Sequence, residues 1–229
     1  MRPYAMVAAR NNAEWCDIVC RSHGVDTRWG RNVWVARRRS PPLYPDAVTV
    51  SADARADGVL RLADSSAGCS VKDSFASLDL STAGFRVLFE AEWIRCPSPP
   101  PNAPADGLDW HVVRTADGLR AWGAAHGGGQ VFRPDLLDHP TVTVLAAFDG
   151  ATIVGAAIAN RSDDVVGLSN VFTAGVEVGP IWTGAVAAAS ARFPGLTLVG
   201  YESGADLDAA REHGFVTTGP LRVWLRDTA

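Results

Sequence analysis

The chain has 229 residues, of which 47% are hydrophobic and 20% charged, and its formal net charge is −4. These values are typical of a globular protein with one large or two small domains, and an acidic chain without a basic stripe disfavours nucleic acid as a partner. No stretch approaches ~18 uncharged apolar residues, so the sequence predicts no membrane span, and the N-terminal residues do not resemble a signal peptide, which favours a cytoplasmic protein.

The N-terminal part shows two weak elements and one unusual loop. Residues 12–23 have helical spacing of apolar side chains, and residues 47–50 begin a strand. Residues 26–39 between them are rich in arginine and are interpreted as a loop, in which Trp29 and Trp34 could line a pocket.

The four cysteines give no metal-binding pattern. Cys16 and Cys20 are four residues apart and so share one face of the first predicted helix. No CxxC or HxxxH spacing accompanies them, so we expect buried cysteines that pack in the core and no metal site.

A proline-rich segment divides the chain. Residues 97–106 contain five prolines in ten positions. Proline fixes φ and lacks an N–H donor, so this segment is unsuited to a helix or a central strand and suits a stiff spacer. The sequence therefore predicts an N-terminal α/β half at residues 1–96, a linker at residues 97–107 and a second domain at residues 108–229.

The second domain alternates strands and helices. Apolar periodicity and turn residues predict, in chain order, a strand at 108–114, a helix at 115–126, strands at 141–148, 151–160 and 165–173, a helix at 180–193, a strand at 196–201, a helix at 205–213 and a strand at 215–226. An antiparallel meander followed by a strand–helix–strand passage requires a mixed sheet. We therefore expect an α/β (α+β) fold with a mixed central sheet flanked by helices.

This order of elements resembles the GNAT family of N-acyltransferases. The matching stretches are the hairpin at residues 145–159, the strand at 168–172 and the late helix that runs into Gly214-Phe215. The resemblance implies transfer of an acyl group from acetyl-CoA or another acyl-CoA. The N-terminal half could be a divergent second copy, since residues 73–95 and 202–226 share an order of acid-Ser, Ala-x-Leu-Asp, Gly-Phe and a closing Trp and Arg. Chance similarity between two short segments is the alternative.

In the family, the phosphates of acyl-CoA lie on a loop that leads into a helix, with the pattern Arg or Gln, two residues, Gly, one residue, Gly or Ala. The matching region is residues 173–185, where the arginine and both glycines of the pattern are missing. Pro180 removes one N–H donor and Glu177 adds a negative charge, although nearby glycines could form a looser anion nest. The resemblance assigns cofactor binding to six residues: Val178, Gly179, Ile181, Trp182, Thr183 and Gly184.

Three residues are candidates for catalysis. Many family members use a tyrosine on the late helix to protonate the leaving thiolate, and Tyr201 is the nearest tyrosine that could replace it. Glu90 and Glu92 lie two apart on a predicted strand and so share a face, where one carboxylate could act as a base. The alternative is that both are on the solvent side of the strand. His111 and His126 are interpreted as structural histidines.

Two functions remain open from the sequence. The first is an acyl- or aminoacyl-transferase that acts on a small amine, and the second is a GNAT-fold module that binds a ligand or a protein without catalysis. An open wedge between the two central strands would favour the transferase, whereas a wedge filled by Trp182 or Ile181 would favour the binding module.

Overall fold

The computed structural model describes residues 4–97 and 107–227. The chain forms two compact units: the first holds the residues up to Trp93 together with those from Thr217 on, and the second is Ile94–Val216. Most of the predicted linker, residues 98–106, lies outside the described residues. The predicted second domain included residues 217–229, whereas in the structure these residues belong to the first unit.

The second unit contains most of the predicted elements. These are β6 (Asp109–Val112), α3 (Ala116–His126), η2 (Gly129–Val131), α4 (Asp135–Asp138), β7 (Val142–Asp149), β8 (Thr152–Ser162), β9 (Val165–Thr173), α5 (Val178–Arg192), β10 (Thr197–Glu202) and α6 (Gly204–Glu212). Each predicted strand and helix of this part is present, with ends that differ by at most two residues. The structure adds the short helices η2 and α4.

Local sequence explains where α3 begins and ends. The Thr115 hydroxyl accepts a hydrogen bond from the Gly118 N–H at 3.1 Å, which caps the first turn. Gly127 ends the helix with a φ of 82°, a left-handed conformation that glycine adopts at little cost. Between these ends, Leu119 and Trp122 lie one turn apart and are both buried.

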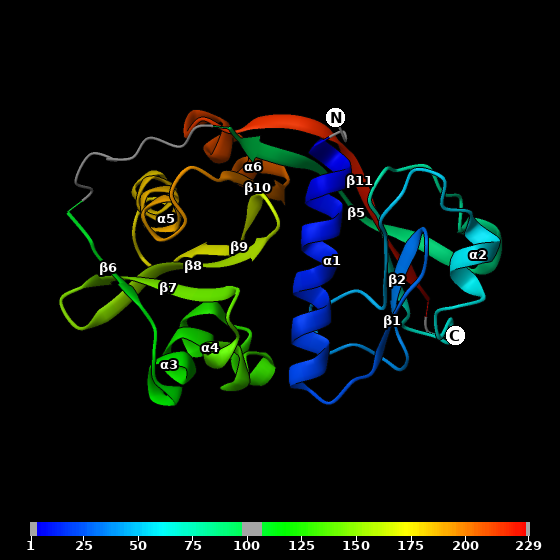
Figure 1. Cartoon of the computed structure of the whole chain (residues 1–229), viewed down its shortest axis with the longest axis horizontal. Helices are drawn as coiled ribbons and strands as arrows, with labels where there is room; N and C mark the ends of the chain where they lie inside the picture. The colour runs from blue at the N-terminus through cyan, green and yellow to red at the C-terminus, as the bar shows by residue number, and fades with distance from the viewer. Residues whose placement is uncertain (1–3, 98–106, 228–229) are drawn as a thin grey trace. The chain divides into compact units, whose positions relative to one another are not determined.

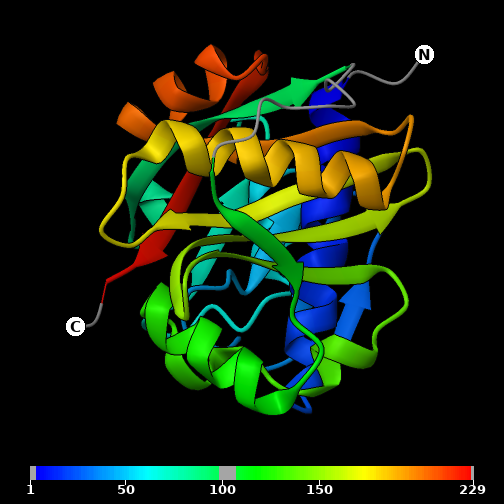
Figure 2. The same ribbon diagram turned by 90° about the vertical axis from the view of Figure 1, so that its left-hand side faces the viewer.

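Helices cover both faces of the sheet in the second unit. Figures 1 and 2 show α5 and α6 over one face of β7–β10, and α3 and α4 over the other. The main apolar core lies on the α5 side, where Trp182, Ala185 and Ala189 pack against Leu168 and Leu198. On the α3 side, the indole N–H of the buried Trp122 donates to the carbonyl of Leu145 at 2.9 Å.

The first unit is built around a long N-terminal helix. Its elements are α1 (Tyr4–Ser22), β1 (Thr27–Trp29), β2 (Val33–Ala36), β3 (Ala47–Thr49), α2 (Ala56–Leu60), β4 (Ser70–Asp73), η1 (Ser81–Ala83), β5 (Phe85–Cys96, which continues into the second unit) and β11 (Val216–Arg226). α1 packs against β1, β2 and β3 (Figure 1). Cys16 and Cys20 are both buried on the face of α1 that contacts these strands, so the predicted core packing of these thiols is confirmed.

The loop predicted at residues 26–39 is in fact a hairpin. Trp29 of β1 pairs with Trp34 of β2, and a turn of three residues joins the strands. The Trp34 side chain is fully buried, and its indole N–H donates to Asp17 of α1 at 2.8 Å. Neither strand was visible in the sequence because each has only three or four residues, too few for apolar alternation to stand out from the surrounding arginines.

The strands form one mixed sheet in the order β1-β2-β3-β4-β11-β5-β10-β9-β8-β7-β6. β3 and β4 are parallel, as are β9 and β10, and α5 makes the crossover between the latter pair. The meander β7-β8-β9 is antiparallel. The predicted α/β class and mixed sheet are therefore confirmed.

The proposed duplication is not shown. Gly84 and Gly214 both have a positive φ, of 79° and 89°, and each precedes a long strand, as the aligned segments suggested. However, the segment that contains Gly214 includes the nine-residue helix α6, whereas only the three-residue helix η1 precedes Gly84. With one sheet in the chain, no separate N-terminal copy is evident.

Candidate functional site

The parallel strands β9 and β10 stay paired over only part of their length. Among the described residues of these two strands, the register covers three pairs and ends with Val199 opposite Gly167. β9 continues to Thr173 along β8, with which it stays paired to its end. Within the described part of the chain, the second half of β9 thus has a paired strand on one edge only, and backbone N–H and C=O groups on the other edge need a partner of another kind.

A bulge in β9 marks the start of this open edge. Phe172 pairs with Ala156 and Ser169 pairs with Ile158, so Asn170 and Val171 together oppose a single residue of β8. Asn170 has a φ of 52°, the left-handed region that few residues other than glycine adopt. Its side-chain amide donates to the Ser169 hydroxyl at 3.1 Å. Bulges and left-handed residues of this kind redirect side chains and occur often beside binding sites.

An aromatic cluster lies against β9 on the α3 side. The ring of His126 stacks on Trp122 with centroids 5.1 Å apart and an interplanar angle of 12°. Phe172 of β9 and Phe132 meet the same imidazole edge-on at 5.3 and 5.0 Å. The His126 Nδ1 atom is buried and has no hydrogen-bond partner among the described residues. Buried polar atoms in folded proteins usually have a hydrogen-bond partner, so this nitrogen is an exception.

The surroundings of His126 keep it neutral near pH 7. Burial lowers the pKa of the imidazole below its ordinary value, and a hydrogen bond with Asn170 opposes this effect only in part. A neutral imidazole is a proton acceptor, as a general base must be. The packing of His126 among aromatic rings agrees with its interpretation as a structural histidine. The cluster itself could not be predicted from the sequence, since it depends on residues from α3, β9 and the segment after η2.

Tyr201 lies on β10, two residues beyond the last pair with β9. Leu198 packs with α5 and α6, and side chains alternate along a strand, so Val199 and Tyr201 point to the opposite face, the one that α3 covers. Tyr201 is half-buried there. The predicted role of Tyr201 as a proton donor is untested, but its face is that of His126.

Glu90 and Glu92 are not part of this arrangement. Both lie on the part of β5 that belongs to the first unit. The Glu90 carboxylate is exposed and forms an ion pair with the guanidinium of Arg222 on β11, at 2.6 Å. Glu92 is half-buried. The pairing of Glu90 agrees with the solvent-side alternative, and the catalytic role predicted for the two carboxylates remains a prediction.

The predicted phosphate loop leads from β9 into α5. The Ala174 N–H donates to the carbonyl of Val154 at 2.8 Å, and the Thr173 hydroxyl donates to that of Val176 at 2.6 Å, so neighbouring backbone fixes the loop. Glu177 is exposed and occupies the N-cap of α5 without a side-chain cap. Its carboxylate lies at the helix end that would otherwise favour an anion.

Inside α5, three of the six predicted cofactor-binding residues are buried in the protein. Ile181 is fully buried, and a Cβ added to Gly155 of β8 would collide with it. Trp182 is 1% exposed and packs edge-on against Phe215 at 5.5 Å. Gly184 is buried as well.

The other three cofactor-binding candidates are half-buried. They are Val178, Gly179 and Thr183, whose hydroxyl donates to the carbonyl of Gly179 at 3.1 Å.

The residues present fit one part of an acyl-CoA molecule and not another. The open edge of β9 offers hydrogen-bonding groups to an extended chain of amides, in the manner of an added strand. The start of α5 offers the backbone N–H groups of Val178 and Gly179, but it lacks one at Pro180 and carries the charge of Glu177. The site therefore suits the amide arm of a thioester donor and is unsuited to its diphosphate.

Residues 4–97 and 107–227 contain neither a metal-binding cluster nor a membrane-spanning helix. No group of three His, Cys, Asp or Glu side chains in these ranges is placed to hold a metal ion. No helix within them is long and apolar enough to cross a membrane.

Comparisons in sequence and in structure give different results. No protein-family model matches the chain, and no curated protein matches it in sequence. A GCN5-related N-acetyltransferase from Kribbella flavida has a TM-score of 0.68 at 15% identity, over 97% of this chain and 96% of its own.

Two other solved structures are similar in the same way. A protein from Novosphingobium aromaticivorans ascribed to the GNAT acetyltransferases has a TM-score of 0.55 at 13% identity, over 93% of this chain and 96% of its own. A GCN5-related N-acetyltransferase from Sphaerobacter thermophilus has a TM-score of 0.50 at 14% identity, over 72% and 61%. At such low identities the likeness shows the fold, and the fold of this chain is that of the GCN5-related N-acetyltransferases.

Proposed function

We propose that this protein is an N-acyltransferase that moves an acyl group from a thioester donor to a small amine. The observation that carries the proposal is the open edge of β9 beyond Gly167. In this stretch β9 remains paired with β8 but is no longer paired with β10. An extended donor arm along this edge would satisfy the backbone groups of residues 169–173. The fold of the neighbouring structures supports the same reaction class.

The side chains on the α3 face supply the proton transfers that the reaction needs. An amine is mostly protonated at neutral pH and attacks a thioester only after it loses a proton. His126, whose lowered pKa keeps it neutral, would accept that proton. The amide bond then forms as the C–S bond breaks, and the hydroxyl of Tyr201 would donate a proton to the leaving thiolate. The second proton that the amine nitrogen loses at this stage would pass through solvent to the tyrosinate and restore the phenol.

The donor is better described as an acyl-pantetheine-like thioester than as acetyl-CoA itself. The two molecules share the amide arm, but only acetyl-CoA carries the diphosphate, for which the start of α5 offers no cationic side chain between residues 173 and 185. A donor without that diphosphate would therefore bind this protein with nearly the same affinity.

A direct assay tests the proposal. Purified protein is incubated with S-acetylpantetheine or acetyl-CoA and a panel of small primary amines, and release of free thiol is followed over time. We expect amine-dependent thiol release with at least one amine, and its loss in a double variant His126→Asn/Tyr201→Phe. If thiol release occurs at the same rate without amine, or survives in the double variant, the assignment of this site fails.

A ligand- or partner-binding module without catalysis is the second candidate. It is favoured by the tight burial of Ile181 and Trp182 and by Glu177, since together they remove the usual place for donor phosphates. Binding of both thioesters with no thiol release for any amine would support this function.

A further inference from the structure

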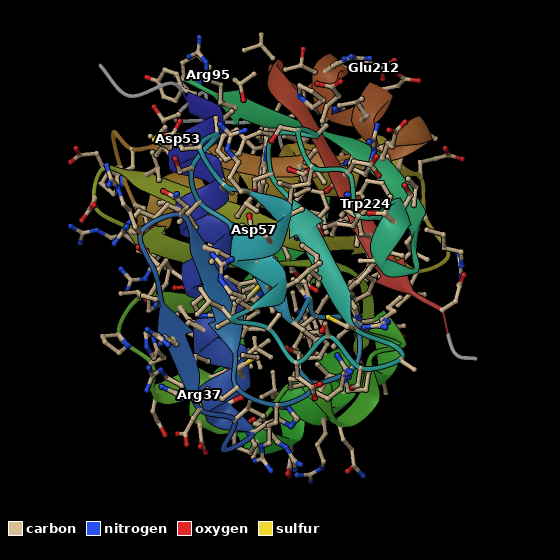
Figure 3. The ribbon with its side chains drawn as sticks, turned by 90° about the vertical axis from the view of Figure 1, so that its right-hand side faces the viewer. Arg37, Asp53, Asp57, Arg95, Glu212 and Trp224 are labelled. Carbon is tan, nitrogen blue, oxygen red and sulfur yellow. The ribbon has the colours of Figure 1, made fainter. Side chains whose placement is uncertain are left out.

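A pocket of about 380 Å³ lies in the first unit, beside the short helix α2. Figure 3 labels Asp57 on α2 and Asp53 on the segment before it. Three segments line the pocket: the turn between β1 and β2, the residues before α2, and α2 with the two residues after it. The lining residues are Arg31, Asn32, Val33, Ala54, Arg55, Asp57, Gly58, Val59, Arg61 and Leu62.

Backbone hydrogen bonds fix the walls of this pocket. The Gly30 N–H donates to the carbonyl of Val33 at 2.8 Å and closes the β1–β2 turn. The Val50 N–H donates to the carbonyl of Asn32 at 2.9 Å, and the Asn32 side-chain amide donates to the carbonyl of Asp53 at 3.5 Å. These bonds join the turn to the segment that leads into α2, so the pocket is largely formed before any ligand arrives.

The floor of the pocket is apolar. Val33, Ala54 and Val59 are all buried and belong to the core of the first unit, and Leu62 packs against that core. Gly58 contributes no side chain, and the guanidinium of Arg61 lies next to it. A flat or compact apolar group would cover this floor and remove it from water.

The rim of the pocket is cationic. Arg31 and Arg55 are exposed, and no carboxylate among the described residues forms an ion pair with either. Arg61 pairs with Asp57 at 2.5 Å, and this hydrogen bond lowers the pKa of the Asp57 carboxyl. The lining thus carries three guanidinium groups and one carboxylate, in a chain whose net charge is negative.

We propose that this pocket binds an organic phosphate monoester with an apolar body. A phosphate monoester carries about two negative charges at neutral pH, which matches the excess of two cations at the rim. Guanidinium groups bind phosphate oxygens in pairs of hydrogen bonds. A carboxylate carries a single charge and would leave one cation uncompensated. The apolar floor selects a phosphate that is attached to a hydrocarbon or aromatic group.

This site goes beyond the proposed acyl transfer and does not depend on it. Every lining residue belongs to the first unit, whereas β9, β10 and His126 belong to the second. Loss of phosphate binding would leave the acyltransferase proposal standing, and absence of thiol release would leave the pocket standing.

Chemical-shift titration of ¹⁵N-labelled full-length protein tests the pocket, with phenyl phosphate as the probe. We expect saturable shifts of the backbone amides of Asn32, Gly58 and Leu62, with a dissociation constant on the order of 1 mM or tighter. Benzoate, with the same ring and a single charge, and inorganic phosphate, without the ring, are each expected to bind about tenfold more weakly. No saturable shift with phenyl phosphate would overturn the site.

The comparison ligands test its two parts separately. If benzoate binds as tightly as phenyl phosphate, the preference for a phosphate monoester is wrong. If inorganic phosphate binds as tightly, the apolar floor contributes nothing and the assigned ligand class is wrong.

Charge-neutralising variants separate a built site from general attraction. Arg31→Gln and Arg55→Gln should each weaken phenyl phosphate binding about tenfold, since each removes a charge-assisted pair of hydrogen bonds. Arg28→Gln is the matched control, because Arg28 is exposed on β1 but does not line the pocket. Asp57→Asn should tighten binding about threefold by releasing Arg61. Equal weakening by all three arginine variants would reduce the site to nonspecific charge and overturn it.

Discussion

The start of α5 and the pocket beside α2 show opposite solutions to binding an anion. The start of α5 is where the GNAT resemblance implies the phosphates of a donor, yet it presents Glu177 and encloses Ile181 and Trp182 in the core. The pocket beside α2 has exposed arginines around an apolar floor. Cationic side chains, rather than glycines or a helix end alone, thus mark the better anion site in this chain, and the fold by itself did not indicate where it would be.

The largest expected effect comes from Trp182. Trp182→Gly removes a fully buried indole that packs against Phe215 and leaves a cavity in the core of the second unit. We expect a loss of about 3–5 kcal/mol in the free energy of unfolding, measured by chemical denaturation. Trp182→Phe should cost far less, because the indole N–H has no hydrogen-bond partner to lose.

The affinity of the Trp182→Gly variant for acetyl-CoA tests why the start of α5 is a poor site for an anion. If the sealed start of α5 were the only obstacle to phosphates, a folded Trp182→Gly protein would gain affinity for acetyl-CoA. We expect no gain, since the missing cations and Glu177 remain. A clear gain would show that the bulk of the Trp182 side chain, and not the charge at the start of α5, makes this region a poorer anion site than the pocket beside α2.

The next largest effect concerns His126. His126→Asn should lower the rate of amine-dependent thiol release by roughly 100-fold, measured as kcat, with donor affinity unchanged. In the wild type, kcat should fall as pH decreases through the lowered pKa of the imidazole, because the protonated ring cannot accept a proton. A variant with wild-type kcat and an unchanged pH profile would remove His126 from the mechanism.

A smaller effect is expected at Glu177. Glu177→Gln removes a negative charge from the start of α5 and should tighten acetyl-CoA binding about threefold by calorimetry. S-Acetylpantetheine has no diphosphate, so its affinity should not change. If the affinities of both donors change equally, the charge of Glu177 acts on the amide arm or on the fold, and not on the diphosphate.

The smallest expected effect is on the pH dependence of the free energy of unfolding. The folded pKa of His126 lies below the ordinary value of 6.5, so the unfolded chain binds the proton first as pH decreases. The stabilisation from the neutral imidazole is thus complete above pH 6.5 and declines as pH falls below it. His126→Asn should flatten the decline of the unfolding free energy below pH 6.5, and an unaltered slope would contradict this assignment.

The fold of the second unit was predictable because its signals are local. Thr115 and Gly127 delimit α3, and the Asp149-Gly150 turn sets the β7–β8 hairpin. The site was not predictable in the same way. The end of β9–β10 pairing and the bulge at Asn170 depend on neighbouring strands, and His126 gains its surroundings from three separate segments. The pocket at Arg31 and Arg55 lies on strands and a helix too short to show periodicity.

Calorimetric binding of S-acetylpantetheine and acetyl-CoA to the wild-type protein distinguishes a site for the amide arm from a site for the diphosphate. We expect both to bind, with affinities within about threefold of each other, because the open edge of β9 would hold the shared arm and the start of α5 would hold no diphosphate. Acetyl-CoA binding more than about tenfold tighter than S-acetylpantetheine would contradict this expectation, as would the failure of both to bind.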